Sequence, residues 1–225
     1  MTLDESQLET KFKNCPICNS SNFVFSSIAQ EKPLVTYYKC ENCYCCFSDR
    51  QPNDMALDEI YNPSHYVSSL TQEDFLSKRL AKKIADVADI NLDKNKLVSI
   101  IDFGGHNGNL CKFLVDELYL RKFKTKGYVV DIHNSVIHNE IGFINAKDFE
   151  GSITKYTIVL ASAVIEHLKN PNFHLEKLID STEDGGLFYA RTPWDVPVGK
   201  IIPNHKLRWP RHLFDLGADF WKNFL

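Results

Sequence analysis

The chain has 225 residues, of which 44% are apolar and 24% are charged, and its formal net charge is −3 at pH 7. This length suits one medium domain with an appendage or two small domains, and the composition predicts a globular chain. The longest apolar runs are about six residues, whereas a membrane-spanning helix needs roughly 20. The slight acidic excess argues against a protein held mainly by nucleic-acid phosphates. It favours small molecules, sugars or other proteins as partners.

Six of the seven cysteines lie between positions 15 and 46. Cys15 and Cys18 form one CxxC pair, and Cys40 and Cys43 form a second. Two CxxC turns together offer the four thiolates of a tetrahedral zinc site, and such a closed site is structural because it has no open position for water. Ordinary buried thiols are the alternative. The pattern predicts one zinc ion bound by these four cysteines.

The spacing of the two pairs leaves room for two strands, near 23–28 and 35–39. We therefore expect residues 1–50 to form a zinc ribbon, a segment too small to fold without its metal. Cys45 and Cys46 follow the second pair, and we interpret them as small apolar strand residues, with an extra or alternate ligand as the other interpretation. The N-terminus is acidic and polar without a signal-peptide core, so we expect a reducing, cytoplasmic location in which disulfides do not persist.

The rest of the chain changes in pattern. Residues 51–70 contain two prolines and three serines and are expected to be a linker with a short helix near 56–60. Strands and helices then alternate, which predicts a doubly wound, mostly parallel α/β sheet over residues 71–225. In chain order we expect a helix at 71–89, a strand at 97–103, a helix at 109–120, strands at 127–132, 142–146 and 156–161, a helix at 171–180 and a strand at 185–192.

A glycine-rich turn follows the first of these strands, where a doubly wound fold binds a nucleotide-like ligand. The dinucleotide fingerprint GxGxxG fails, because His106 and Asn109 stand where its second and third glycines should be, and the phosphate-binding GxxxxGK[ST] motif is absent. Asp102, Gly104 and Gly108 fit the pattern DxGxxxG instead. This resembles the first motif of class I S-adenosylmethionine-dependent methyltransferases, usually DxGxGxG, with His106 replacing the middle glycine.

Further segments resemble the same family in the correct order. The second strand ends at Asp131, matching the family's acid for the ribose hydroxyls, and Ile132 matches the residue packed on adenine; a strand-end turn acid is the alternative for Asp131. The resemblance covers residues 15 to about 215 and extends to class I enzymes with an N-terminal zinc ribbon, such as C-methyltransferases of deoxysugar pathways. The other matching segments are 145–149, with Asp148 against the adenine amino group or as a plain loop acid, 156–171 and 185–193.

The resemblance implies that S-adenosylmethionine binds at the carboxyl edge of the sheet. It also implies a core sheet extended by a sixth and a seventh strand. We expect both to be missing here, because residues 220–225 resemble the helix that precedes them in the family. The residues expected to bind the cofactor are Asp102, Gly104, Gly105, His106, Gly108, Asp131, Ile132, Asp148, Phe149 and Ser162.

The expected activity is methyl transfer to a small molecule or a sugar derivative such as a sugar nucleotide. Three histidines are candidates for taking the acceptor's proton: His167 after the fourth strand, and His205 and His212 in a segment that mixes cations with aromatic rings. A turn-shaping role for His167 and a solvated loop for the other two are the alternatives. The alternative functions are methylation of RNA or protein, and a catalytically silent scaffold with the same fold.

Overall fold

The computed structural model describes residues 1–62, 70–192 and 208–224. Contacts along the chain divide it into two compact units, which we call the ribbon unit and the sheet unit. The ribbon unit contains the N-terminal part of the chain and two later segments, and the sheet unit contains the rest. The ribbon unit comprises Met1–Val67, Ile165–Asn172 and Thr192–Leu225, and the sheet unit comprises Ser68–Val164 and Phe173–Arg191.

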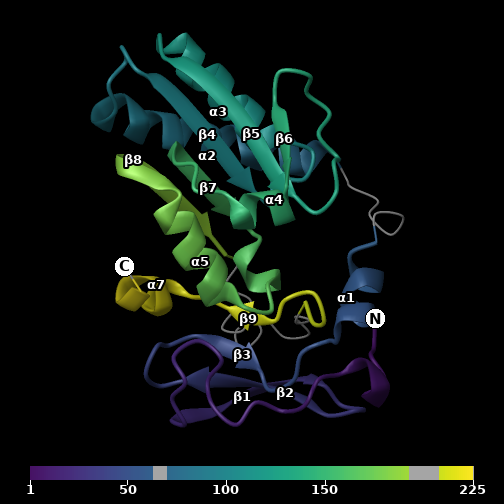
Figure 1. The fold of residues 1–225 in the computed structure, drawn as a ribbon. Helices are drawn as coiled ribbons and strands as arrows, with labels where there is room; N and C mark the ends of the chain where they lie inside the picture. The colour runs from purple at the N-terminus through teal and green to yellow at the C-terminus, as the bar shows by residue number, and fades with distance from the viewer. Residues whose placement is uncertain (63–69, 193–207, 225) are drawn as a thin grey trace. The chain divides into compact units, whose positions relative to one another are not determined.

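The sheet unit is built on five parallel strands in the order β6-β5-β4-β7-β8 (Figure 1). The order runs outward in both directions from β4, which is the doubly wound topology that the sequence predicts. In the described part of the chain, no sixth or seventh strand joins this sheet. The strands are β4 (Leu97–Phe103), β5 (Lys124–Asp131), β6 (Gly142–Asn145), β7 (Tyr156–Ser162) and β8 (Thr182–Arg191).

Helices cover both faces of this sheet. On one face, α2 and α3 pack their buried side chains, such as Ala85 and Leu114, into the main hydrophobic core. On the other face, the ring of Phe103 lies 5.8 Å from the ring of Phe149 in α4 and 5.6 Å from that of His174 in α5. These contacts bury both faces, as a parallel sheet requires. The helices are α2 (Leu70–Asn91), α3 (Asn109–Leu120), α4 (Ala146–Gly151) and α5 (Pro171–Asp180).

Most expected elements of the sheet unit are present, with three main differences. β5 begins at Lys124, three residues before its expected start. β8 begins three residues earlier than expected, at Thr182. The segment around Asp148 is the short helix α4 rather than a loop, because the side chain of Asn145 caps it by accepting a hydrogen bond from the Lys147 N–H at 3.0 Å. Among the helices of the described residues, none combines the length and apolar character needed to cross a membrane.

The ribbon unit contains an antiparallel sheet in the order β1-β2-β3-β9. Its last strand comes from the C-terminal part of the chain: Phe214 pairs with Phe47, and Asp215 pairs with Cys46. The sequence predicts β1, β2, the strand that contains Cys46, and the helices α1 and α7, but it gives no sign of this fourth strand. The elements are β1 (Phe23–Gln30), β2 (Val35–Cys40), β3 (Cys46–Ser48), β9 (Phe214–Asp215), α1 (Asp54–Ile60), α7 (Ala218–Phe224), and the 3₁₀ turns η1 (Glu5–Gln7) and η3 (Ile165–His167).

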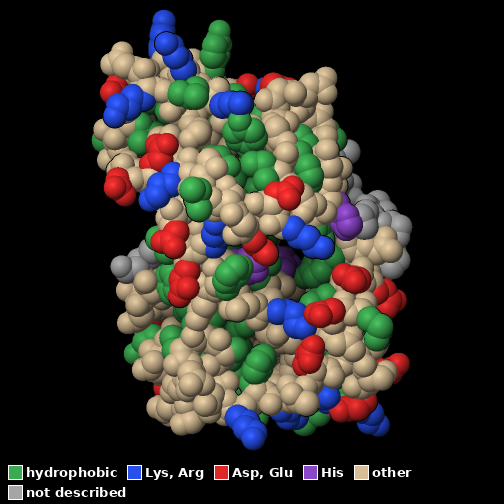
Figure 2. Space-filling model, in the orientation of Figure 1, with side chains coloured by type: hydrophobic (Ala, Val, Ile, Leu, Met, Phe, Trp, Pro, Cys, Tyr) green, Lys and Arg blue, Asp and Glu red, His purple; other side chains and the backbone are tan. Residues whose placement is uncertain are grey.

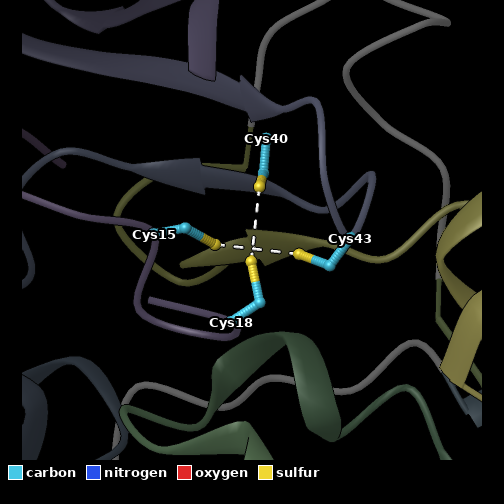
Figure 3. Close-up of side chains that lie close together, drawn as sticks. All are labelled: Cys15, Cys18, Cys40 and Cys43. Carbon is cyan, nitrogen blue, oxygen red and sulfur yellow. Dashed lines mark hydrogen bonds between the residues drawn. The ribbon is translucent and has the colours of Figure 1, made fainter. Parts of the chain in front are cut away.

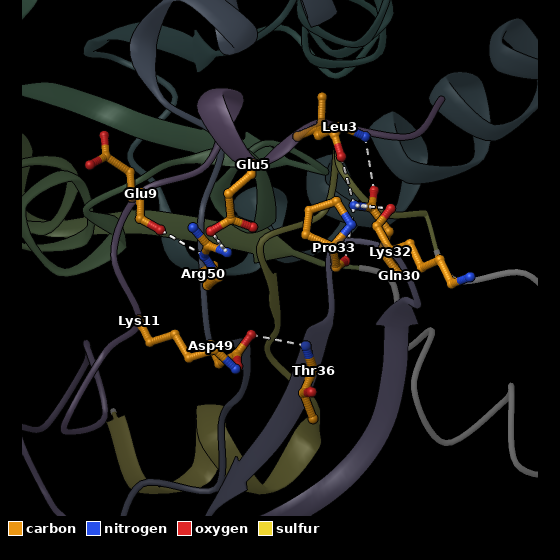
Figure 4. A network of polar contacts seen from close by, with 10 residues as sticks. All are labelled: Leu3, Glu5, Glu9, Lys11, Gln30, Lys32, Pro33, Thr36, Asp49 and Arg50. Carbon is orange, nitrogen blue, oxygen red and sulfur yellow. Dashed lines mark hydrogen bonds and ion pairs between the residues drawn. The ribbon is translucent and has the colours of Figure 1, made fainter.

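Polar contacts fasten the N-terminal segment to the ribbon sheet (Figure 4). The buried side chain of Gln30 accepts a hydrogen bond from the Leu3 N–H at 2.9 Å and donates to the Leu3 carbonyl at 2.8 Å. The Asp49 carboxylate accepts from the Thr36 N–H at 2.9 Å and pairs with Lys11 at 2.6 Å. Because Gln30 and Asp49 are buried, these bonds satisfy groups that would otherwise destabilise the fold.

Candidate functional site

Four cysteine side chains of the ribbon unit converge on one point (Figure 3). The sulfur atoms of Cys15, Cys18, Cys40 and Cys43 all lie within 4.8 Å of one another. The Cys15–Cys43 and Cys18–Cys40 sulfur distances are 3.7 and 3.5 Å. A tetrahedral zinc ion with Zn–S bonds of about 2.3 Å would hold its sulfurs roughly 3.8 Å apart. The four cysteines that the sequence singles out therefore fit this ion.

A fifth sulfur approaches this cluster. The Cys45 side chain is fully buried, and its sulfur lies 3.6 Å from that of Cys15 and 3.4 Å from that of Cys43. Hydrogen bonds from Cys43 and Cys45 lower the pKa of Cys15 to about 2, and the same contacts with Cys15 raise the pKa values of Cys43 and Cys45. Sulfur atoms gathered this closely suit a cation that binds thiolates.

The glycine turn lies at the carboxyl end of β4 in the sheet unit. Gly104 and Gly108 have φ angles of +70° and +82°, which glycine adopts without strain, and a Cβ atom on Gly104 would overlap the side chain of Val164. Gly108 caps α3, so the turn presents the N-terminal end of that helix. His106 also has a positive φ, +48°, and it is exposed. The turn therefore forms a backbone cradle although its middle glycine is replaced.

Asp102 lies beneath this cradle. Its side chain is fully buried, and burial raises its pKa to about 7. One carboxylate oxygen, Oδ2, has no hydrogen-bond partner among the described residues. A Cβ atom on Gly105 would lie 2.8 Å from that oxygen, which explains why glycine occupies this position. A buried carboxyl group with an unused oxygen suits a nearby cationic ligand group.

Asp131 ends the neighbouring strand β5. Its two carboxylate oxygens accept backbone hydrogen bonds, Oδ1 from Ile132 at 2.7 Å and Oδ2 from His106 at 3.1 Å. The Ile132 side chain is 57% exposed, so an apolar surface lies next to the acid. An acid followed by an exposed apolar residue at a strand end is the arrangement expected for a ribose and a purine ring.

The remaining residues that were expected to bind the cofactor differ in how exposed and how engaged their side chains are. Ser162 ends β7, and its hydroxyl oxygen accepts from Nε of Arg191 at 3.2 Å, a strand-end cation that the sequence analysis did not single out. Asp148 is exposed in the first turn of α4. Phe149 is only 1% exposed and packs in the core beside Phe103, so its side chain supports this face of the sheet.

The ribbon unit contains a second group of titratable side chains. Glu166 and His167 lie in η3, and His212 precedes β9. One ligand-type atom from each of the three lies within 4.8 Å of the others. Oε1 of the fully buried Glu166 is 3.8 Å from Nε2 of His167, and the ring centres of the two histidines are 4.8 Å apart. The third histidine candidate, His205, lies outside the described residues.

Tyr61 is part of this group and was missed by the sequence analysis. Its hydroxyl oxygen lies 3.0 Å from Nδ1 of His167 and donates to the Arg211 carbonyl at 2.9 Å. In the sequence it stands at the end of a short predicted helix, and no signal there pointed to contact with His167. The structure thus brings together side chains from three segments that are far apart in the chain.

Comparisons with known proteins identify the family of this chain and similar folds. A family model described as a methyltransferase domain matches residues 72–217. No curated protein sequence matches the chain significantly. Among solved structures, the CurJ carbon methyltransferase is 17% identical with a TM-score of 0.50, and the match covers 74% of this chain and 52% of that one.

Two other solved structures are similar. Streptomyces venezuelae DesVI is 14% identical with a TM-score of 0.43, covering 58% of this chain and 59% of that one. The plantazolicin methyltransferase BpumL, in complex with SAH, is 20% identical with a TM-score of 0.38, covering 57% and 47%. This chain thus spans about half the length of these structures. The match of the family model to well over half of its residues shows that the chain belongs to the methyltransferase domain family.

Proposed function

We propose that the protein is an S-adenosylmethionine-dependent methyltransferase that acts on a small molecule or sugar derivative, with one structural zinc ion in its ribbon. The observation that carries the proposal is the pairing of the glycine cradle with Asp131, whose carboxylate accepts a hydrogen bond from the cradle's own His106 N–H at 3.1 Å. We also propose a cytoplasmic, reducing location, where cysteines persist as thiols and metal ligands rather than as disulfides.

The residues of the sheet unit fit S-adenosylmethionine. The buried Asp102 beneath the cradle suits the positive charges of the methionine part, and the cradle allows close approach of its tail. Asp131 would accept the ribose hydroxyls, and Ile132 would contact the adenine. The cofactor supplies an activated methyl group on a sulfonium, so the protein mainly contributes proximity and orientation.

An acceptor that keeps its proton needs a base. We propose that a histidine of the group after β7, His167 or His212, or else His205, takes this proton, because imidazole accepts protons near neutral pH. In the sequence this group begins close to the cofactor residues, since only four residues lie between Ser162 at the end of β7 and His167. Tyr61 would hold the His167 ring in place.

The charge distribution supports a small acceptor over a nucleic acid. On the face drawn in Figure 2, the acidic and basic side chains of the described residues are interspersed. The exposed Arg208 and Arg211 lie in the segment next to His212, where they could meet an anionic group such as the diphosphate of a sugar nucleotide.

Calorimetric titration with S-adenosylmethionine and its demethylated product tests the proposal directly. We expect binding of both ligands at one site per chain. An absence of binding by folded protein would instead favour a silent scaffold with the methyltransferase fold. A methyl-transfer assay with sugar nucleotides and with RNA would then separate the proposed acceptor class from the alternative; strongly salt-dependent RNA methylation would favour the latter.

A further inference from the structure

The group formed by Glu166, His167 and His212 has the donor set of a metal site separate from the cysteines. It offers one carboxylate oxygen and two imidazole nitrogens, with ligand atoms within 4.8 Å of one another. Two histidines and a carboxylate bind divalent first-row transition metals, zinc among them. The cysteine cluster, by contrast, offers sulfur alone.

The hydrogen bonds of His167 determine which of its ring nitrogens carries the hydrogen and which carries the lone pair. Nδ1 lies 2.9 Å from the carbonyl oxygen of Arg211, and Tyr61 donates its hydroxyl hydrogen to the same carbonyl. Because a carbonyl oxygen only accepts, Nδ1 must carry the ring hydrogen and donate it. The lone pair of the neutral ring is then on Nε2, 3.8 Å from Oε1 of Glu166. Metal-binding histidines usually have this arrangement, with the other ring nitrogen donating to a carbonyl.

The surroundings hold these donors in place. Glu166 is fully buried, and a metal ion is one of the partners that stabilise a buried carboxylate. Its backbone carbonyl accepts from the Leu213 N–H at 2.8 Å. The His212 carbonyl accepts from the hydroxyl of Tyr37, a ribbon strand residue. The ribbon sheet therefore fixes the backbone on both sides of the group.

We propose that Glu166, His167 and His212 bind a divalent transition-metal ion, with zinc as the ion that this donor set suits. Three protein ligands leave at least one coordination position for water or for an oxygen atom of a ligand. The inference goes beyond methyl transfer and holds for any acceptor. It also makes His167 a metal ligand rather than a free base whenever the ion is bound.

Cobalt(II) titration of the full chain, purified with its cysteine-bound zinc, tests the proposal. Cobalt bound by nitrogen and oxygen absorbs in the visible region without the near-ultraviolet sulfur-to-metal charge-transfer band that cobalt shows at a cysteine site. We expect a further equivalent of cobalt with this sulfur-free spectrum, and competition by added zinc.

Variants locate the ion. His167→Ala and His212→Ala should each abolish the sulfur-free spectrum, and Tyr61→Phe, which removes an outer partner of His167, should weaken cobalt binding by roughly 10–100-fold. His133→Ala replaces an exposed histidine of the sheet unit and should bind as the unchanged chain does. Thermal unfolding checks that each variant is folded. Glu166→Gln keeps the shape of the side chain and should weaken cobalt binding. If a histidine variant fails to fold, the test uses Glu166→Gln in its place.

Cobalt bound only with the sulfur spectrum, or bound equally well by the histidine and Glu166→Gln variants, would overturn the proposal. The group would then be an ion pair between a protonated His167 and Glu166. Calorimetry with S-adenosylmethionine on the same samples keeps this outcome separate from a failure of the proposed function. The residues expected to bind S-adenosylmethionine belong to the sheet unit, whereas the proposed metal ligands belong to the ribbon unit.

Discussion

The backbone N–H of His106 donates a hydrogen bond to Oδ2 of Asp131 at 3.1 Å. This bond joins the glycine turn after β4 to the end of β5, so the two parts of the expected cofactor site hold each other in position. The second oxygen of Asp131 is oriented by the N–H of Ile132. A carboxylate fixed in this way loses little further freedom when it accepts the hydroxyls of a ribose.

The first prediction concerns Asp131. Replacing it by alanine removes acceptors for two ribose hydroxyls, and hydrogen bonds to a charged group contribute about 1.5–3 kcal/mol each at most. Affinity for S-adenosylmethionine, measured by calorimetry, should fall at least roughly tenfold. Asp184→Ala, which changes an exposed acid of the same unit, is the matched control. Unchanged affinity in Asp131→Ala would remove the ribose assignment.

The second prediction concerns the cysteine cluster. Metal analysis of protein purified without added zinc should find about one equivalent bound by four thiolates. Cys15→Ala should lose this metal, whereas Cys45→Ala should retain it. The reverse result would show that the ligand assignment is wrong. Chelation should increase hydrogen exchange first in β1, β2 and β3, because the metal supplies much of the stability of so small a segment.

The third prediction follows from the burial of Asp102, which raises its pKa from 3.8 to about 7. The native state therefore holds this proton more tightly than the unfolded chain does, so the group's contribution to stability falls as pH rises from about 4 to 7 and then stays low. Asp102→Asn removes the charge and should be more stable than the unchanged chain at pH 8, by at most about 4 kcal/mol, with little difference near pH 4.

Denaturant unfolding without cofactor at both pH values measures this difference. Asp184→Asn, at an exposed acid, serves as control. If Asp102→Asn shows the same difference in unfolding free energy at pH 4 and pH 8, the buried carboxyl group does not carry the raised pKa.

The fourth prediction concerns turnover on an identified acceptor. Replacing the histidine that takes the proton should lower turnover by about 10²–10⁴ and leave cofactor affinity nearly unchanged. When no ion is bound by Glu166, His167 and His212, we expect His167→Ala to have this effect, since Tyr61 and the Arg211 carbonyl orient its ring. His133→Ala is the control. Normal turnover in single alanine variants of His167, His205 and His212 would show that another group carries the proton.

Much of this molecule could be predicted from local sequence. The β-branched run before the glycines gives β4 (Leu97–Phe103), and the amphipathic pattern after them gives α3 (Asn109–Leu120) with its predicted bounds. The spacing of apolar residues that marks a helix or a strand is contained within one short stretch of sequence, so that stretch alone predicts the element. The same holds for a CxxC turn, which brings two sulfurs together within four residues, as in Cys15 to Cys18.

The group around Glu166 could not be predicted in this way. Tyr61 and His167 are 106 residues apart, and Tyr37 and His212 are 175 apart, yet hydrogen bonds join each pair. Their positions depend on the pairing of β9 with β3, a contact of only two residues per strand. Two residues carry too little periodicity to mark a strand in a sequence.

The sequence by itself determined the parallel sheet, the glycine turn, the strand-end Asp131 and the four cysteines that converge. These features rest on periodicity, on the backbone freedom of glycine and on short spacings. Only the tertiary structure decided that Glu166, His167, His212 and Tyr61 form one group. Contacts between distant segments are stable when the surrounding sheet and core already hold the backbone, because the entropy lost on joining them must be offset by packing elsewhere in the fold.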